Sequence, residues 1–169
     1  MTELLSGNQV MSITYTPIGT IHSPYQDKAD MPIQPTGATG VEGRVELLEE
    51  FKEGLTDLDG FSHVILLYHF HRSENYQLKV IPFMDREQRG LFSTRAPKRP
   101  NPIGLSIVQL EKVKDNILYI RNIDVLDGTP LLDIKPYIPE FDAQNKVSTG
   151  WFKQTRETVS QYRSDERFK

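Results

Sequence analysis

The stretch "IGLSIVQLEKVKDNILYIRNIDVL", residues 103–126, holds two apolar runs on either side of Lys114-Asp115-Asn116. Asp and Asn tolerate the dihedral angles of tight turns, so the stretch predicts a β-hairpin with its turn at 114–116. Val, Ile, Tyr and Phe are typical of strands, whereas Gly, Pro, Asp and Asn are typical of the connections between them. Residues 103–113 and 117–126 are therefore predicted to be paired strands.

The same composition recurs along most of the chain, in runs at 13–21, 41–48, 62–71, 78–84, 89–95 and 131–138. Because no long helices alternate with these runs, a doubly wound parallel sheet is disfavoured. Many short strands with turn signals indicate a barrel or a sandwich, and a closed barrel leaves no edge unpaired. The predicted class is therefore mainly β.

Helical signals are few. One short helix is expected at 49–58, broken by Gly54. A second is expected within 151–169, where the spacing of Trp151, Thr155, Thr158 and Tyr162 is helical. Residues 1–11 lack periodicity and are expected to be a tail, and Met11 is an alternative start of translation.

Composition narrows the functional classes. The chain has 169 residues, of which 37% are hydrophobic and 25% are charged, and this predicts one globular domain. Its net charge of −3 argues against nucleic-acid binding through overall charge, so any anion site must be local. The lack of cysteine excludes disulfides and thiolate metal sites. No run approaches the roughly 18 apolar residues of a membrane span, so we expect a cytoplasmic protein without a membrane partner.

A stiff cationic loop precedes the 103–113 strand. "RAPKRPNP" (95–102) contains three prolines and the cations Arg95, Lys98 and Arg99. Proline fixes φ and extends the residue before it, so these cations are held on a rigid loop that suits an anion. A rigid loop that only keeps a strand edge soluble explains the same composition equally well.

Polar residues also cluster in "DVLDGTPLLDIKPYIP" (124–139). Asp127-Gly128 predicts a turn. A period of two then places Asp133, Lys135 and Tyr137 on one face of a strand, with Leu132, Ile134 and Ile138 on the other. The row of acid, amine and phenol suits a reactive site, but a cross-strand ion pair on a solvated face is the more ordinary explanation.

Three histidines lie in the stretch "FSHVILLYHFHRS" (61–73). Alternation places His63, His69 and His71 on one face with Ile65 and Leu67. A metal site is not expected, since no nearby Asp or Glu at suitable spacing completes one with His69 and His71. His71 and Arg72 better fit the rim of a pocket. The chain also has no nucleophile elbow and no G-x-G-x-x-G loop after a strand.

Taken together, four stretches resemble one family. They are "PIGTIHSPY" (17–25), "GLTDLDGFSHVILLYHFH" (54–71), "RGLFSTRAPKRPNPIGLS" (89–106) and "DVLDGTPLLDIKPYIP" (124–139). In order and spacing they are similar to the TsaA-like family, the tRNA threonylcarbamoyladenosine methyltransferases called TrmO. The resemblance covers about residues 13–142, and it implies a TsaA-like barrel domain at 12–142 with a C-terminal extension at 143–169.

The resemblance implies a single-sheeted β-barrel of non-Rossmann type that works as a homodimer. It also implies S-adenosyl-L-methionine as cofactor, and methylation of the exocyclic nitrogen of threonylcarbamoyladenosine next to the anticodon of tRNA. Many bacterial members carry a further C-terminal domain, whereas only about thirty residues follow Pro139 here. The resemblance therefore does not say how this chain holds tRNA.

The family's cofactor pocket maps onto several separate segments of this sequence. The implied cofactor-binding residues are Pro35, Thr36, Gly37, His71, Arg72, Arg95, Leu105, Asp124, Val125, Leu126, Asp127, Gly128 and Thr129. The proline-rich loop would then hold Arg95 at the cofactor and offer Lys98 and Arg99 to tRNA phosphates, which position RNA without selecting sequence.

The chemistry of methyl transfer suggests two candidate bases and two candidate cations. The carbamoylated adenine nitrogen is a poor nucleophile until its proton leaves, so a base must lie within hydrogen-bonding reach. Asp133 is the first candidate and His71 the second, while Lys135 or Arg95 would stabilise charge on the carbamoyl oxygen. Three alternatives stay open: a non-catalytic barrel that binds S-adenosyl-L-methionine or RNA, a methyltransferase for another substrate, and, more remotely, a metal hydrolase using His69 and His71.

Overall fold

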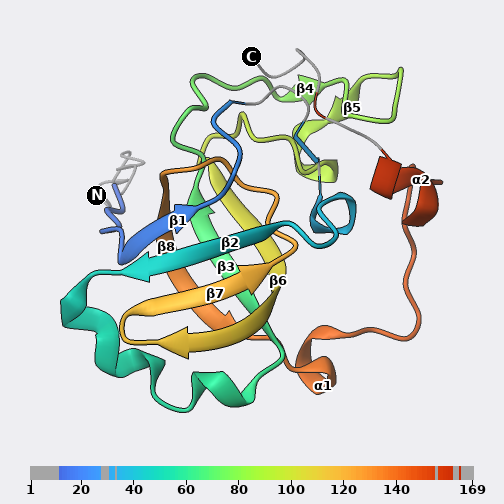
Figure 1. Ribbon diagram of the computed structural model, residues 1–169. Helices are drawn as coiled ribbons and strands as arrows, with labels where there is room; N and C mark the ends of the chain where they lie inside the picture. Colours follow the sequence, from blue (N-terminus) through green and yellow to red (C-terminus); the bar gives the residue numbers. More distant parts are fainter. Residues whose placement is uncertain (1–11, 28–30, 33, 155, 162–163, 165–169) are drawn as a thin grey trace, which may run out of the picture.

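Six strands close into an antiparallel barrel in the order β1-β2-β7-β6-β3-β8 (Figure 1). The computed structural model describes residues 12–27, 31–32, 34–154, 156–161 and 164. Each barrel strand hydrogen-bonds to a neighbour on both sides, which confirms the single-sheeted barrel. The strands are β1 (Gly19–His22), β2 (Glu42–Leu47), β3 (His63–His69), β6 (Ile103–Lys114), β7 (Ile117–Arg121) and β8 (Thr129–Pro136).

The predicted hairpin forms between β6 and β7. Asp115 has a φ of 56°, in the left-handed region that Asp and Asn tolerate better than most residues. Asn116 donates a hydrogen bond from its side chain to the carbonyl of Leu47, at 2.6 Å, and so ties the turn to β2. The turn at 114–116 is therefore confirmed.

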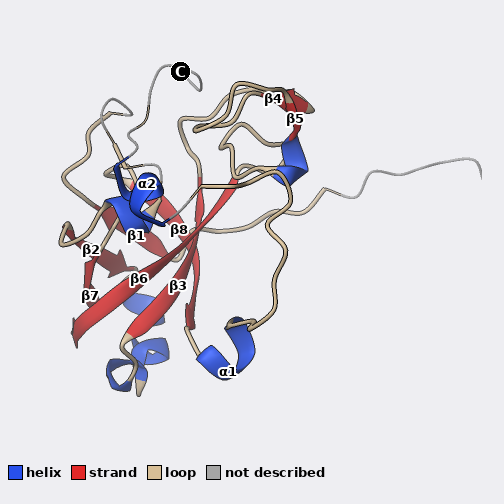
Figure 2. Ribbon diagram, turned by 90° about the vertical axis from the view of Figure 1, so that its right-hand side faces the viewer, coloured by secondary structure: helices blue, strands red, loops and turns tan. Residues whose placement is uncertain are grey.

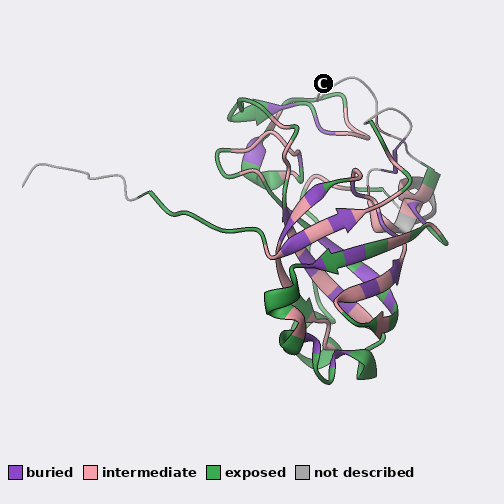
Figure 3. Cartoon of the chain, turned by 60° about the vertical axis from the view of Figure 1, so that its left-hand side comes forward, coloured by how far each residue is buried: buried purple, intermediate pink, exposed green. Residues whose placement is uncertain are grey.

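Alternation along the strands builds the core. On β3 the side chains of Val64, Leu66 and Tyr68 are buried, and on β6 every second residue from Gly104 to Leu110 is buried (Figure 3). Each fully buried aliphatic side chain contributes roughly 1.5–3 kcal/mol. His63, Ile65, Leu67 and His69 lie on the outer side, as the sequence predicts.

Most of the strands are shorter than the predicted runs. Of the 13–21 run only residues 19–21 lie in a strand, which continues to His22, and residues 12–17 are exposed. Strand β1 begins at Gly19, where a Cβ would collide with the backbone of β2 at Glu46. Strands β4 (Lys79–Val80) and β5 (Arg89–Gly90) pair only with each other.

The helices differ from expectation in two places. The segment 49–60 forms two 3-10 helices, η2 (Glu49–Leu55) and η3 (Leu58–Gly60), and the break falls at Asp57 with a φ of 66° rather than at Gly54. The C-terminal helix is α2 (Arg156–Gln161), and Trp151 lies outside it. Thr155 and Tyr162, two of the residues used for that prediction, lie outside the described residues.

The other short helices belong to connections. They are η1 (Pro35–Gly37), η4 (Leu91–Ser93) and the unexpected α1 (Pro139–Asp142). In the described part of the chain, none of the helices is both long and apolar enough to cross a membrane. The division of the chain at residues 11 and 142 stays a prediction.

A β-bulge in β8 corrects the predicted facing of this strand. Leu67 pairs with Asp133 and Tyr68 with Leu131, so Leu132 is an extra residue. The fully buried position therefore belongs to Leu131 and not to Leu132. Beyond the bulge, Ile134 packs against the core as predicted.

The two ends of the barrel carry different segments. Residues 49–60 lie at one end, and the loops that carry β4 and β5 lie at the other (Figures 1 and 2). In an antiparallel barrel the start of one strand lies beside the end of its neighbour. The loop end therefore gathers residues that are far apart in the sequence.

Candidate functional site

The loop end of the barrel brings together most of the predicted cofactor-binding residues. Connections 23–41, 70–102 and 122–128 all meet there (Figure 1). They carry 35–37, His71, Arg72, Arg95 and most of 124–129. Leu105 differs, because it lies on the outer face of β6 opposite Leu67 and is 48% exposed.

Arg95 joins the proline-rich loop to the segment before η1. Its Nη1 donates a hydrogen bond to Oε1 of Gln34 at 3.1 Å. The next residue, Ala96, is buried in a small apolar cluster with Val80 and Leu91, against which Phe83 packs. The loop is therefore anchored by Ala96 while the Arg95 side chain stays exposed.

Arg99 is used within the loop itself. Its Nη1 lies 3.0 Å from the carbonyl oxygen of Thr94, 3.4 Å from that of Ala96 and 3.5 Å from that of Leu91. Its guanidinium also lies over the ring of Phe92, at 5.6 Å from the centroid. These contacts stiffen the loop, and Lys98 beside it is half-buried. Contact of Lys98 and Arg99 with phosphates stays a prediction.

His71 is brought next to Thr129 at the start of β8. Nδ1 of His71 lies 3.3 Å from Oγ1 of Thr129, and the Thr129 hydroxyl donates to the carbonyl of Leu126 at 2.8 Å. Arg72 donates to the carbonyl of Gln26 at 2.8 Å. Two predicted segments, 71–72 and 124–129, thus meet directly.

A buried polar chain leads from the barrel interior to Asp124. Ser106 donates from Oγ to Oδ1 of Asp124 at 2.6 Å, and the hydroxyl of Tyr68 lies 2.9 Å from Oγ of Ser106. Burial raises the pKa of Asp124 to about 6, although the Ser106 hydrogen bond and the charge of Arg95 act in the opposite direction. Burial, together with the nearby charge of Asp124, raises the pKa of Tyr68 as well.

The sequence prediction missed Tyr68 and Ser106. A signal for Tyr68 was nevertheless present, because the alternation in 62–71 places a phenol on the otherwise apolar inner face. Buried hydroxyls are nearly always hydrogen-bonded, so such a position implies a polar partner. Nothing in the local pattern identifies that partner as Ser106 or places Asp124 beyond it.

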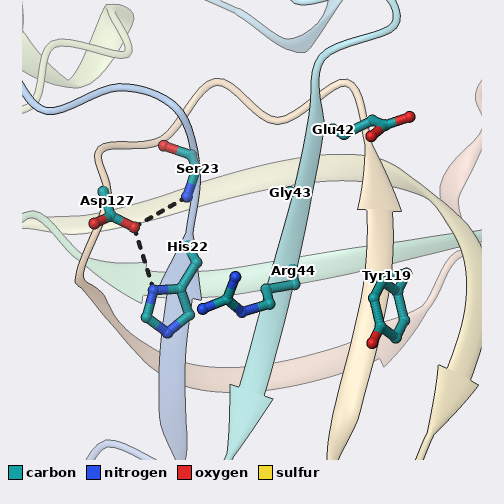
Figure 4. Close-up of a pocket in the computed structure, with 7 residues that line it drawn as sticks. All are labelled: His22, Ser23, Glu42, Gly43, Arg44, Tyr119 and Asp127. Atoms are coloured by element: carbon teal, nitrogen blue, oxygen red, sulfur yellow. Dashed lines mark hydrogen bonds and ion pairs between the residues drawn. The ribbon is translucent and has the colours of Figure 1, made fainter.

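Asp127 points to the outside of the barrel. It accepts hydrogen bonds from Nδ1 of His22 and the amide of Ser23, both at 3.2 Å, and from Gln26 at 3.4 Å (Figure 4). Burial alone would raise the pKa of Asp127, but these donors lower it below its usual value. The pocket here has a volume of about 410 Å³ and is lined by His22, Ser23, Glu42, Gly43, Arg44, Tyr119 and Asp127. The stretch 124–129 is therefore divided between two sides of the barrel wall.

Asp133 and Lys135 lie on the outer face of β8. Nζ of Lys135 is 2.7 Å from Oδ2 of Asp133, and the two side chains are 60% and 43% exposed, respectively. Asp133 follows Thr129 by four residues, which is roughly 13 Å along a strand. The structure therefore has an ion pair on a solvated face, but it forms within β8 and not across strands as the ordinary explanation had it. Its participation in catalysis stays a prediction.

The segment after α1 reaches the same end of the barrel. Nε1 of Trp151 donates to the carbonyl of Ser93 at 2.9 Å, and the guanidinium of Arg89 lies over the indole ring at 5.3 Å. The amide of Ser164 donates to the carbonyl of Met31 at 2.7 Å. Within the described residues, no group of three His, Asp or Glu side chains is arranged to hold a metal ion.

Comparison with known proteins agrees with this architecture. The chain is 53% identical over 158 residues to a probable S-adenosyl-L-methionine-binding protein of Pyrococcus abyssi, covering 94% of this chain and 86% of the relative. It is 39% identical over 139 residues to the tRNA (adenine(37)-N6)-methyltransferase of Mus musculus, covering 78% of this chain but 32% of the relative.

A solved structure has the same fold. The crystal structure of TrmO from Pseudomonas aeruginosa superposes with a TM-score of 0.72 at 40% identity, over 85% of this chain. This chain spans 64% of the length of that protein. The sequence profile of the tRNA-methyltransferase O N-terminal domain matches residues 20–143, which include all six strands of the barrel except Gly19. The chain therefore belongs to the tRNA-methyltransferase O N-terminal domain family.

Proposed function

We propose that this protein is a methyltransferase that uses S-adenosyl-L-methionine and acts on the exocyclic nitrogen of adenosine 37 in tRNA. The observation that carries the proposal is the convergence of Arg95, His71, Asp124 and η1 from separate segments at one end of the barrel. Membership of the family and the names of its relatives support the same activity. We place the reaction in the cytoplasm, where tRNA is modified.

The residues at this end suit the chemistry of the cofactor. S-adenosyl-L-methionine carries a carboxylate, an ammonium group, a ribose diol and an adenine ring, and its sulfonium supplies an electrophilic methyl group. Arg95 offers an exposed guanidinium for a carboxylate, and Asp124 offers an acceptor for ammonium or hydroxyl donors. The main chain of 35–37 and 125–129 adds further donors and acceptors. The donor set therefore fits the cofactor.

Substrate chemistry requires a base and a stabiliser of negative charge. We propose a tRNA whose adenosine 37 already carries the threonylcarbamoyl group, because loss of the nitrogen proton is then eased by the neighbouring carbonyl. His71 is the better supported base, since it lies at the loop end beside Thr129. Asp133 is held by Lys135 on the outer face and would need a tRNA or a partner subunit to come within reach. Arg95 would stabilise charge on the carbamoyl oxygen.

We further propose that the protein is a homodimer. Ile103, Leu105 and Ile107 are exposed by 42%, 48% and 38%, and they follow one another along the outer face of β6. Ile65 and Leu67 lie beside them on β3. Such a row of apolar side chains on a strand surface suits burial against a second copy. Leu105 would then lie both at the partner and near the cofactor end.

A non-catalytic barrel that binds S-adenosyl-L-methionine is the second candidate. It is favoured by one observation: the P. abyssi relative, which the chain covers over 86% of its length, is named for cofactor binding alone. The two candidates differ in whether a methyl group is transferred.

Transfer from labelled S-adenosyl-L-methionine tests both candidates. The protein is incubated with tRNA that carries or lacks the threonylcarbamoyl group, and the nucleosides are resolved by mass. We expect label only on the premodified adenosine. Label on both tRNAs would support methyl transfer but contradict the proposal that the adenosine must already carry the threonylcarbamoyl group. Bound cofactor without any label would favour the non-catalytic barrel.

A further inference from the structure

Two buried hydroxyl side chains and one half-buried carboxylate connect the interior of the barrel with the proposed cofactor site. Tyr68 comes from β3, Ser106 from β6 and Asp124 from the connection after β7. Tyr68 is 4% exposed and Ser106 is 1% exposed. Below them on the inner face lie aliphatic side chains such as Leu66 and Val108. The three residues form a polar layer between an apolar core and the loop end.

The two hydrogen bonds that link Tyr68, Ser106 and Asp124 are both donated toward Asp124. Oγ of Ser106 donates its only proton to the Asp124 carboxylate at 2.6 Å. The bond of 2.9 Å between Ser106 and Tyr68 must then be donated by the Tyr68 hydroxyl. The Tyr68 hydroxyl therefore donates to Ser106, and the Ser106 hydroxyl donates to the carboxylate of Asp124, which only accepts.

Space for the tyrosine is provided by the motif that leads into β6. Gly104 lies opposite Tyr68 in the β3–β6 register, and a Cβ at residue 104 would collide with the Tyr68 ring. Gly104 ends the same "RPNPIG" stretch that carries Arg99 and follows Arg95. One short stretch thus holds the cationic loop and allows the phenol to reach Ser106.

We propose that Tyr68 and Ser106 are positioning residues that hold the Asp124 carboxylate, in its ionised form, as the acceptor for donor groups of S-adenosyl-L-methionine. The proposal rests on the proposed cofactor site. Arg95 and Tyr68 are the charged and titratable groups that act on Asp124 from neighbouring elements. A carboxylate in this buried place would otherwise take up a proton and lose its capacity to accept two donors.

The affinity for S-adenosyl-L-methionine as a function of pH tests the proposal. In the parent protein the affinity should fall as the pH drops through about 6, because protonated Asp124 accepts fewer hydrogen bonds. Ser106→Ala removes a bond that favours the ionised carboxylate. The inflection should therefore move upward by about one pH unit, with about threefold weaker binding near pH 6.5.

Tyr68→Phe should move the inflection in the same direction by less, because Ser106 still reaches Asp124. Ser106→Thr keeps the hydroxyl and should leave the inflection near that of the parent. The matched controls are Tyr137→Phe and Ser62→Ala: the Tyr137 ring lies 6.4 Å from the His63 ring, and the Ser62 hydroxyl lies 2.9 Å from Nδ1 of His63, on the outer side of the barrel. Calorimetric titration from pH 5 to 8.5 gives the dissociation constants, and the carboxyl carbon-13 shift of Asp124 gives its titration directly.

These measurements distinguish a failure of the positioning role of Tyr68 and Ser106 from a failure of the proposed cofactor site. If Asp124→Asn weakens binding but Ser106→Ala and Tyr68→Phe leave both the inflection and the carbon-13 titration unmoved, the positioning role is wrong and the site stands. A lower melting temperature alone for Ser106→Ala, without any movement of the titration, has the same meaning. If Asp124→Asn and Arg95→Ala both bind as the parent does, the cofactor site is wrong, and the positioning role falls with it.

Discussion

The two ends of the barrel are closed by different kinds of side chain. At one end, η2 and η3 insert Leu55 and Leu58 into the core, and both are at most 9% exposed. At the other end the apolar core gives way to Tyr68, Ser106 and Asp124, which carry polar groups into a buried layer. The first end therefore stabilises the fold, whereas the second holds a destabilising charge, to which we have assigned a role in binding as a proposal.

The largest effect is expected at the apolar end. Leu55→Ala removes a buried side chain and leaves a cavity, so the free energy of unfolding should fall by about 2–4 kcal/mol. Urea denaturation measures the change. The dissociation constant for S-adenosyl-L-methionine should stay within twofold of that of the parent, since Leu55 lies at the opposite end. A large loss of affinity in the folded variant would contradict the separation of the two ends.

A substitution at the polar end is expected to raise the free energy of unfolding and not to lower it. The pKa of Asp124 in the folded protein is about 6 against an ordinary 3.8, so ionising it costs more in the folded state than in the unfolded state. The resulting destabilisation is complete above about pH 6 and disappears below about pH 4. Asp124→Asn should therefore raise the free energy of unfolding at pH 7.5 by on the order of 1–3 kcal/mol, while cofactor binding weakens.

Denaturation of Asp124→Asn and the parent at pH 7.5 and pH 4 checks this sign. The difference between the two proteins should be mostly lost at the lower pH, because Asp124 is then neutral in the folded state and only partly ionised in the unfolded state. A variant that is less stable than the parent at pH 7.5 would mean that the charge of Asp124 stabilises the fold, and the contrast between the two ends would be lost.

The smallest effect is expected on the outer wall between the ends. Asp133→Asn breaks an exposed ion pair with Lys135, which stabilises a protein by about 0.2–1 kcal/mol at most. With His71 as the base, methyl transfer by the variant should stay close to that of the parent, with unchanged cofactor affinity. A loss of turnover of a hundredfold or more, at unchanged affinity, would instead identify Asp133 as the base.

Comparison of β8 with β3 shows where the alternation of residues along one strand predicts correctly which side chains face the core. On β3 the alternation of Val64, Leu66 and Tyr68 is regular, and the predicted facing is confirmed. On β8 the same rule fails at Leu132, because the pairing with β3 shifts by one residue there. A bulge is set by two strands together, so the residues of one strand do not reveal it.

The candidate site also has features that follow from local sequence and features that do not. Stiffness of the 95–102 loop follows from its prolines, and the contacts of Arg99 with three carbonyls add to it. By contrast, Asp124 and Asp127 are three residues apart yet lie in different surroundings, one beside Ser106 and the other beside His22. The family resemblance grouped them into one predicted site, whereas the path of the connection between β7 and β8 gives them different hydrogen-bond partners.

The sequence by itself determined the strands, the turn at Asp115 and the polar rim motifs, because backbone preferences and a period of two act between near neighbours in the chain. Only the tertiary structure decided that the 49–58 helix breaks at Asp57 and that Tyr68 reaches Asp124 through Ser106. The chain from Tyr68 to Asp124 joins residues 38 and 18 positions apart. Closure of the barrel brings such residues together, and no local preference specifies it.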